Sequence, residues 1–369
     1  MPFHFIRIVA LAGVLFCLYP ACIKAQETMP EKADSSATKP EKKIKIFAVP
    51  LLFYSYDTRW GAGAGGILTF PGKPLRSSVT ISVAFTQREQ ILLFFPFQWY
   101  SGNGQWRAYG EIGWFRYFYQ YFGVGNTYAN QFAEPYTAQY PRLRLTLARN
   151  LNAKQLAGLR LQFDDFTMLK VQEGGEIDQK LLSGSEGGRM SSAGAVWLYD
   201  SRDNQFFPHK GAFVELSAFA GNQIIGSQFR HLRLSADAAR YFPLGKNQVL
   251  VMHGALQFSA GEIPFFLLPQ LGGPRRLRGY PDGKFRDLHS ALLQSEFRFP
   301  LFWRFKGVSF LAAGAVFGQK NEAVRIRPNA GAGLRFEFDR TQHLHLRLDY
   351  GFGLGKNNHS FYLTIGEAF

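Results

Sequence analysis

The chain has 369 residues, enough for two or three soluble domains, but 16% of them are aromatic and 38 are glycine. This composition favours strands and turns over the runs of alanine, leucine, glutamate and lysine that build helices. Lysine and arginine exceed aspartate and glutamate by 15. Both cysteines, Cys17 and Cys22, lie near the N-terminus. Disulfide staples and thiolate metal sites are therefore excluded from the rest of the chain, and we expect no cofactor and no metal.

The first 25 residues resemble an export signal. Basic residues precede the apolar run IVALAGVLFCLYPAC, and a small residue, Ala25, stands where cleavage is expected. The run is shorter than the ~20 residues of a membrane-spanning helix. Lipidation at Cys22 is the alternative, although Tyr19 and Pro20 fit a lipidation motif poorly. We therefore predict a signal peptide at 1–25.

Residues 26–45, QETMPEKADSSATKPEKKIK, are polar, charged and interrupted by two prolines. Such a composition does not bury enough apolar surface to fold, and the segment is far shorter than the ~50 residues of a small domain. We predict a disordered periplasmic tether. The excess of cations predicts contacts with anionic outer-membrane lipids and lipopolysaccharide. No nucleic-acid partner is expected, because an exported protein has little access to nucleic acid.

From residue 46 onward, apolar and polar residues alternate with a period of two, which indicates strands with two different faces. In LLQSEFRFP, for example, Leu293 and Phe297 fall on one face while Glu296 and Arg298 fall on the other. The alternation marks sixteen segments. They span 46–56, 60–70, 77–87, 90–100, 105–119, 137–150, 154–168, 187–200, 211–221, 227–242, 247–260, 289–299, 305–317, 327–338, 343–353 and 359–369.

Two features distinguish these segments from the strands of a soluble sandwich. They are longer than the soluble mode of ~5–6 residues and close to the ~9–11 residues that cross a bilayer at a tilt. Aromatic residues also cluster near segment ends, as in WY at 99–100 and FW at 302–303, like the girdles of membrane barrels. We predict an all-β fold, a 16-stranded antiparallel transmembrane β-barrel spanning 46–369 in the bacterial outer membrane. A secreted β-sandwich or solenoid is the alternative.

The longest connection on the predicted outer side contains LGGPRRLRGYPDGKF, residues 271–285. A phosphate-binding P-loop needs a following Lys-Ser/Thr and a helix, and neither is expected here. A basic surface loop for external anions is one alternative. The tetrapeptide LRGY resembles the Val/Leu-Arg-Gly-Phe/Tyr motif of the BamA/TamA-like barrels of the bacterial surface antigen superfamily, in which this loop folds back into the lumen. The resemblance implies the same lumen-loop motif here, formed by Leu277, Arg278, Gly279 and Tyr280.

An arginine in a confined lumen needs a carboxylate to offset the cost of burial. The inward face of the strand that follows the loop offers Glu296, and we expect Glu296 to anchor Arg278. The family usually has a further aspartate in the next strand, within a Phe-x-Asp-x-Gly motif. Ala312 stands in its place, between Phe310 and Gly314, so Arg278 is expected to rely on Glu296 alone.

A second stretch, YDSRDNQFFPHKGAFVEL, is similar to the family's Asp-x-Arg-Asp-Asn turn, and we predict a structural turn on the periplasmic side. Its motif residues are Asp200, Arg202, Asp203, Asn204, Pro208 and Gly211. The start, YSYDTRWGAGAGG, resembles the family's first hairpin, with Tyr56 ending the first strand. Phe369 is expected to be the terminal aromatic residue of the closing strand. The resemblance covers about 46–369.

The resemblance implies a barrel that assists insertion or translocation of polypeptides or lipids at the outer membrane, with client outer-membrane proteins as partners. Most relatives carry periplasmic polypeptide-transport-associated domains, and 26–45 is too short to be one; a separate periplasmic partner is one way to supply them. A weak seam between the first and last strands is the expected mechanism. WGAGAGGI lacks large side chains, Pro50 removes a ladder donor, and Gly366 lies near the end of the last segment.

Two other classes of function compete with this one. A passive channel for small, preferentially anionic solutes is the alternative, because arginines and acids together are expected to line a wet lumen. An enzyme is not expected. His343, His345, His359 and Ser360 have no catalytic motif around them, and His-x-His lacks further metal ligands.

Overall fold

The computed structural model describes residues 44–55, 59–71, 77–126, 133–318, 323–340, 343–355 and 358–369. The predicted signal peptide, nearly all of the predicted tether, and Tyr56 lie outside the described residues.

Most of the described chain is β-strand. The strands are β1 (Lys45–Ser55), β2 (Arg59–Thr69), β3 (Ser78–Thr86), β4 (Ile91–Tyr100), β5 (Trp106–Tyr121), β6 (Glu134–Asn152), β7 (Gln155–Val171), β8 (Gly187–Asp200), β9 (Gly211–Gly221), β10 (His231–Gly245), β11 (Gln248–Gly261), β12 (Gln270–Leu271), β13 (Phe285–Arg286), β14 (His289–Pro300), β15 (Phe305–Phe317), β16 (Arg327–Asp339), β17 (Leu344–Gly353) and β18 (His359–Ile365). Two short 3-10 helices, η1 (Gln223–Ile225) and η2 (Phe265–Leu267), lie in connections. Neither these nor any other helix of the described residues has the length and apolarity to cross a membrane.

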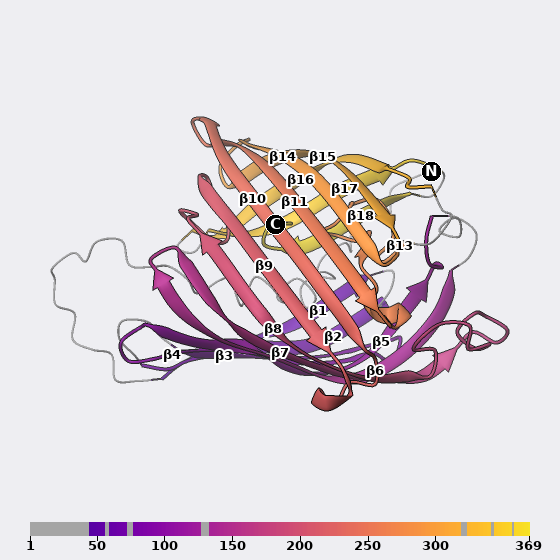
Figure 1. Ribbon diagram of the computed structural model, residues 1–369. Coiled ribbons are helices and arrows are strands. Elements are labelled where there is room, and N and C mark those ends of the chain that lie inside the picture. Colours follow the sequence, from indigo (N-terminus) through magenta and orange to yellow (C-terminus); the bar gives the residue numbers. More distant parts are fainter. Residues whose placement is uncertain are drawn as a thin grey trace.

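The described strands other than β12 and β13 form one antiparallel sheet, in which each strand pairs with its neighbours in sequence. The order runs from β1 to β11, passes directly to β14, and ends at β18. The sheet curves round into a barrel shape with tilted strands (Figure 1). The predicted all-β antiparallel fold is thus confirmed. In the described pairings β1 meets only β2, and β18 meets only β17, so closure of a sixteen-stranded barrel stays a prediction.

The two faces of the sheet differ in the way the alternation predicts. In β14, Glu296 and Arg298 are at most 1% exposed. Leu293, on the opposite face of the same strand, is 58% exposed. Leu159 and Phe361, on distant strands, are also turned outward. An apolar outside around a buried polar inside is the reverse of a soluble protein, and it is stable where lipid covers the outer face. The surface of the described sheet is therefore that of a membrane-embedded β-protein.

The two ends of the sheet carry different connections. At one end, called here the turn end, β8 joins β9 through 201–210 and β14 joins β15 through 301–304. At the other, called the loop end, the connections include 172–186, 222–230 and 262–288. The turn end corresponds to the predicted periplasmic side.

The segment predicted at 227–242 begins later than expected. β10 starts at His231 because the residues before it belong to a turn around η1. There the Ser227 amide donates to the Asn222 carbonyl oxygen at 2.9 Å.

The prediction that the last strand runs to Phe369 is wrong. β18 ends at Ile365. Gly366 adopts a φ of 80°, a left-handed conformation that glycine reaches without steric penalty. The backbone therefore leaves the sheet at Gly366, and the C-terminus lies within the outline of the barrel (Figure 1).

Candidate functional site in the lumen

The connection 262–288 folds into the lumen and has an apolar core of its own. Leu271, Leu277, Tyr280 and Phe285 are at most 1% exposed. They pack in one cluster against the lumen face of β11, β14 and β15. Burying these side chains stabilises the loop inside the barrel at roughly 1.5–3 kcal/mol for each large apolar group.

A left-handed turn presents Arg278 to the wall. Leu277 has a φ of 64° and Gly279 a φ of 105°. A Cβ at Gly279 would lie 2.7 Å from the Phe352 amide nitrogen, and a Cβ at Gly351 would lie 2.7 Å from the Arg278 carbonyl carbon. The loop and β17 thus touch backbone to backbone, which only glycine permits at both positions.

Arg278 is fully buried and contacts two carboxylates. Its Nη2 donates to Glu296 Oε2 at 2.9 Å and its Nη1 donates to Asp349 Oδ2 at 2.6 Å. The guanidinium also lies over the Phe310 ring, 3.4 Å from the centroid, a cation–π contact that strengthens when water is excluded. The expectation that Arg278 relies on Glu296 alone is wrong. Asp349 of β17 provides the acid that Ala312 does not.

These contacts belong to a larger buried group, called here the lumen cluster. Its members are Arg278, Glu296, Arg298, Arg335, Arg347, Asp349 and Glu367, all at most 3% exposed in their side chains. Arg335 donates to Asp349 through Nη1 at 2.5 Å and to Glu367 through Nε at 2.9 Å. Arg298 Nε donates to Glu296 Oε1 at 2.8 Å. Removing one partner of such a buried pair costs about 3–5 kcal/mol, because the other charge stays buried without compensation.

The rest of the LRGY motif is held by β16 to β18. The Gly279 amide donates to the Tyr362 hydroxyl at 2.9 Å. The Tyr280 hydroxyl donates to the Pro328 carbonyl at 2.9 Å and accepts from the Leu354 amide at 2.8 Å. The motif therefore ties the loop to the last three strands of the sheet, next to one of its two edges.

The turn at 201–210 is shaped by its predicted motif residues. Arg202 Nε donates to Asp200 Oδ1 at 2.9 Å. The Asp203 side chain accepts hydrogen bonds from three backbone amides of the turn. Asn204 Oδ1 accepts from the Phe207 amide at 2.8 Å. These bonds replace the backbone pairing that a tight turn loses.

Pro208 and Gly211 complete that turn. Pro208 is buried. Gly211 has a φ of 105°, and a Cβ there would lie 2.2 Å from the Ser201 carbonyl oxygen. Gly211 thus lets the backbone at the start of β9 approach the Ser201 carbonyl, where any side chain would clash.

Phe369, predicted to end a strand at the membrane, lies inside the barrel instead. Its ring stacks on His253 of β11 at 4.6 Å between centroids, with 9° between the planes. It packs there beside Tyr241 and Val251.

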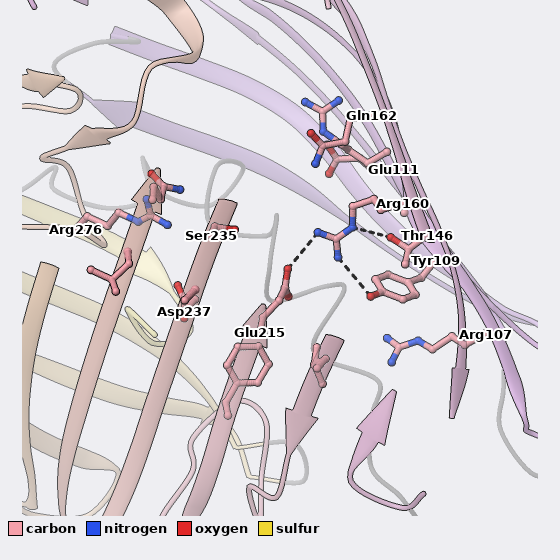
Figure 2. Close-up of a pocket in the computed structure, with 17 residues that line it drawn as sticks. Arg107, Tyr109, Glu111, Thr146, Arg160, Gln162, Glu215, Ser235, Asp237 and Arg276 are labelled. Carbon is pink, nitrogen blue, oxygen red and sulfur yellow. Dashed lines mark hydrogen bonds and ion pairs between the residues drawn. The ribbon is translucent and has the colours of Figure 1, made fainter. Parts of the chain in front are cut away.

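A cavity of ≈ 320 Å³ lies beside the loop, lined by residues of β5 to β11. Figure 2 shows Arg160 on one side of it and Arg276, from the loop, on the other. Arg160 donates to Glu215 Oε1 at 3.1 Å and to Thr146 Oγ1 at 2.8 Å. The wall therefore carries charges of both signs, and its Arg160–Glu215 pair keeps part of its surface exposed.

The histidines considered for catalysis do not assemble a site. His343 Nδ1 lies 2.8 Å from Glu337 Oε1 at the turn end, whereas His359 and Ser360 begin β18 at the loop end, where His359 is opposite Phe352. Across the described ranges, no group of three or more His, Cys, Asp or Glu residues is placed to hold a metal ion.

Alternation places Asp349 of β17 on the inward face, but sequence reasoning did not pair it with Arg278. LDYGFG puts Asp349, Gly351 and Gly353 on one face by alternation, so an acid and two residues without side chains line the same strip of the lumen. A Cβ at Gly353 would lie 2.2 Å from the Tyr280 ring. The sequence signal for this contact was the alternation of one acid and two glycines at every second position of the strand.

Comparisons with known proteins agree with this architecture. The Omp85 superfamily domain matches residues 70–369. BamA from Haemophilus ducreyi lacking POTRA domains 1–3 is 14% identical, with a TM-score of 0.62, over 92% of this chain and 74% of that one. CdiB from Escherichia coli is 14% identical, with a TM-score of 0.60, over 88% of this chain and 63% of that one. The chain thus spans less than two thirds of CdiB, and at this identity the likeness concerns the fold. None of the curated proteins matches the chain.

Proposed function

The chain belongs to the Omp85 superfamily, and we propose that it assists insertion or translocation of polypeptides or lipids at the outer membrane through a barrel plugged by its own loop. The observation that carries the proposal is the anchoring of Arg278 by Glu296 and Asp349. A loop clamped in the lumen would obstruct a path for solutes, so we place the working surface at the sheet edge beside the clamp.

The strands at the two edges of the sheet support this assignment. β18 has seven residues, whereas β17 has ten. β2 carries GAGAGG opposite β1, and strands without large side chains gain little from cross-strand contacts. In contrast, β5 and β6, which have 16 and 19 residues, pair along the whole of β5, from Trp106 opposite Arg149 to Tyr121 opposite Glu134. A seam between β1 and β18 would therefore be limited by the seven residues of β18 to few backbone hydrogen bonds.

The proposal includes the surroundings of the barrel. Outer-membrane lipids and lipopolysaccharide would cover the exposed apolar face, and client outer-membrane proteins would approach the seam. We retain the division into a signal peptide at 1–25, a tether at 26–45 and a barrel at 46–369, with a separate periplasmic partner as a further binding candidate.

A passive channel for small anions is the competing function, and the ≈ 320 Å³ cavity is the observation in its favour. The charges around it weaken the case for anion preference. Arg160 is paired with Glu215 and Arg144 with Asp164. Each of these two pairs brings together opposite charges, which reduces the positive field that selection of anions would need.

Two measurements on wild type and Arg278→Ala separate the two functions. The first is single-channel conductance in planar bilayers. The second is the folding rate of a small, urea-unfolded outer-membrane barrel protein added to liposomes that contain the chain. We expect a nearly closed wild type that accelerates folding of the client, and a leakier Arg278→Ala. Arg230→Ala is the matched control, since Arg230 is exposed in a loop-end connection.

A steadily open wild type with anion preference and no effect on the client would establish the channel instead. A closed wild type that leaves the client's folding rate at the value of empty liposomes, with Arg230→Ala behaving alike, would overturn the role in insertion.

A further inference from the structure

The turn end of the lumen is occupied by two segments other than the loop. One is the C-terminal tail, Gly366–Phe369, and the other is the turn 201–210. Both reach inward from the end opposite to the one at which the loop enters, and both contact members of the lumen cluster.

The tail is fixed at each of its ends. The Gly366 amide donates to the His345 carbonyl oxygen at 2.9 Å, and Phe369 stacks on His253. Between them, Glu367 receives Arg335 Nε at 2.9 Å and lies 3.7 Å from Arg298 Nη2. The Glu367 carboxylate is only 3% exposed, so it has lost most of its hydration. The two guanidiniums compensate for that loss, and moving the tail would separate these buried charges.

The turn places an aromatic ring under the same cluster. Phe207 is 1% exposed. Lys306 Nζ lies 4.0 Å from the centroid of its ring and the Arg298 guanidinium 5.0 Å from it. The His345 ring lies 4.3 Å away. The ring thus fills the space between the cations of β14 and β15 and the tail's attachment point on β17.

Arg298 and Arg335 connect the two ends of the lumen. Each contacts Glu367 of the tail, and each also contacts Glu296, which holds Arg278 of the loop. If Glu367 leaves, four guanidiniums share two carboxylates. Arg298 and Arg335 then draw Glu296 and Asp349 toward themselves, and their uncompensated charge repels Arg278. Seating of the tail and seating of the loop must therefore favour each other.

We infer that the tail and Phe207 form a second plug at the turn end, coupled to the loop through Arg298 and Arg335, so that the lumen opens at both ends together. This coupling goes beyond the proposed function, because it would operate in a channel as well as in an insertion barrel. Coupling between two sites is reciprocal, so the tail should report on the loop.

A reporter cysteine in the tail tests the inference. Ala368 is 5% exposed. Both natural cysteines precede residue 26, so in a protein that begins at residue 26 the substitution Ala368→Cys introduces a single thiol for labelling. The barrel is reconstituted in liposomes, and the rate of labelling by a membrane-impermeant maleimide is measured. We expect slow labelling in the parent and labelling about ten-fold faster when Arg278→Ala is added, a size typical of coupled sites.

Matched variants test whether a change in labelling rate comes from the loop and the turn. Arg230→Ala should leave the rate unchanged, Phe207→Ala should raise it, and Phe206→Ala, at a half-buried neighbour in the same turn, should raise it less. Arg278→Lys keeps the charge without the two-pronged hydrogen bonding and replaces Arg278→Ala if that variant does not show a folded band on a gel.

Conductance gives the reciprocal measurement. Glu367→Gln should increase leakage, and adding it to Arg278→Ala should change conductance by a smaller factor than it does alone. Fast labelling in the parent would show that the tail is not held. Equal labelling rates with and without Arg278, or multiplicative effects on conductance, would show that the two plugs are independent. Any of these results overturns the inference.

Discussion

The two walls of the lumen use the same chemistry in different surroundings. On the wall of β14 to β18, arginines and carboxylates are covered by the loop and the tail, and Arg335 and Glu296 have no exposed side-chain surface. On the wall of β7 to β9, Arg160 and Glu215 keep 17% and 26% exposure and face the cavity. The segments that cover a wall, more than the strands themselves, thus decide whether an arginine–carboxylate pair is fully buried or remains accessible to solvent.

The largest effect is expected from Arg335→Met. The change leaves Glu296, Asp349 and Glu367 with less compensation in a buried site, so it should lower the free energy of unfolding by about 3–5 kcal/mol. The temperature at which the folded band disappears on a gel, or the circular dichroism midpoint in detergent, measures it. Arg160→Met on the hydrated wall is the control. Equal losses for the two variants would contradict the comparison.

A steric change tests whether the loop rests against β17. Gly351→Ala places a Cβ 2.7 Å from the Arg278 backbone, so the loop or β17 must shift at a cost of about 1–3 kcal/mol. We expect faster cleavage of the loop by an added protease. Gly254→Ala on β11, where the nearest atom would be 3.8 Å from the new Cβ, should behave like wild type. Similar cleavage rates for the two variants would mean that the loop does not rest on β17.

The hydrated wall should respond weakly. Glu215→Gln removes the carboxylate that pairs with Arg160, and pairs with access to water contribute only about 0.2–1 kcal/mol. Thermal unfolding measures the loss. A loss as large as that of Arg335→Met would show that the cavity is dry.

The smallest effect is a pH dependence at the turn end. Burial lowers the pKa of His209 below its ordinary value of 6.5, with Asp203 acting in the opposite direction. The unfolded chain therefore binds more protons than the folded one below pH 6.5, and stability contributed by neutral His209 is lost as pH falls from 6.5 toward the lowered pKa. The thermal midpoint of His209→Gln should therefore change less than that of wild type when the pH is lowered from about 7.5 to 5.5. Parallel pH profiles for the two proteins would refute this.

The sequence by itself determined the strand faces and the place of the loop. Alternation with a period of two identified which residues of β14 face inward, and it did so because successive side chains of a strand must point to opposite sides. The cluster of glycines and cations before β14 identified the loop. The resemblance of LRGY and of the Asp-Arg-Asp-Asn turn then pointed to the family.

The tertiary structure alone decided which inward acids meet Arg278. Glu296 is 18 positions away, on β14, the first sheet strand after the loop, but Asp349 is 71 positions away on β17, which β15 and β16 separate from β14. Which acid lies at the right height depends on strand tilt and loop depth, and neither is local. The tail shows the same limit. A terminal phenylalanine after an alternating segment predicts a strand, yet Gly366 turns it inward, because the guanidiniums of β14 and β16 supply Glu367 with partners that the local sequence does not contain.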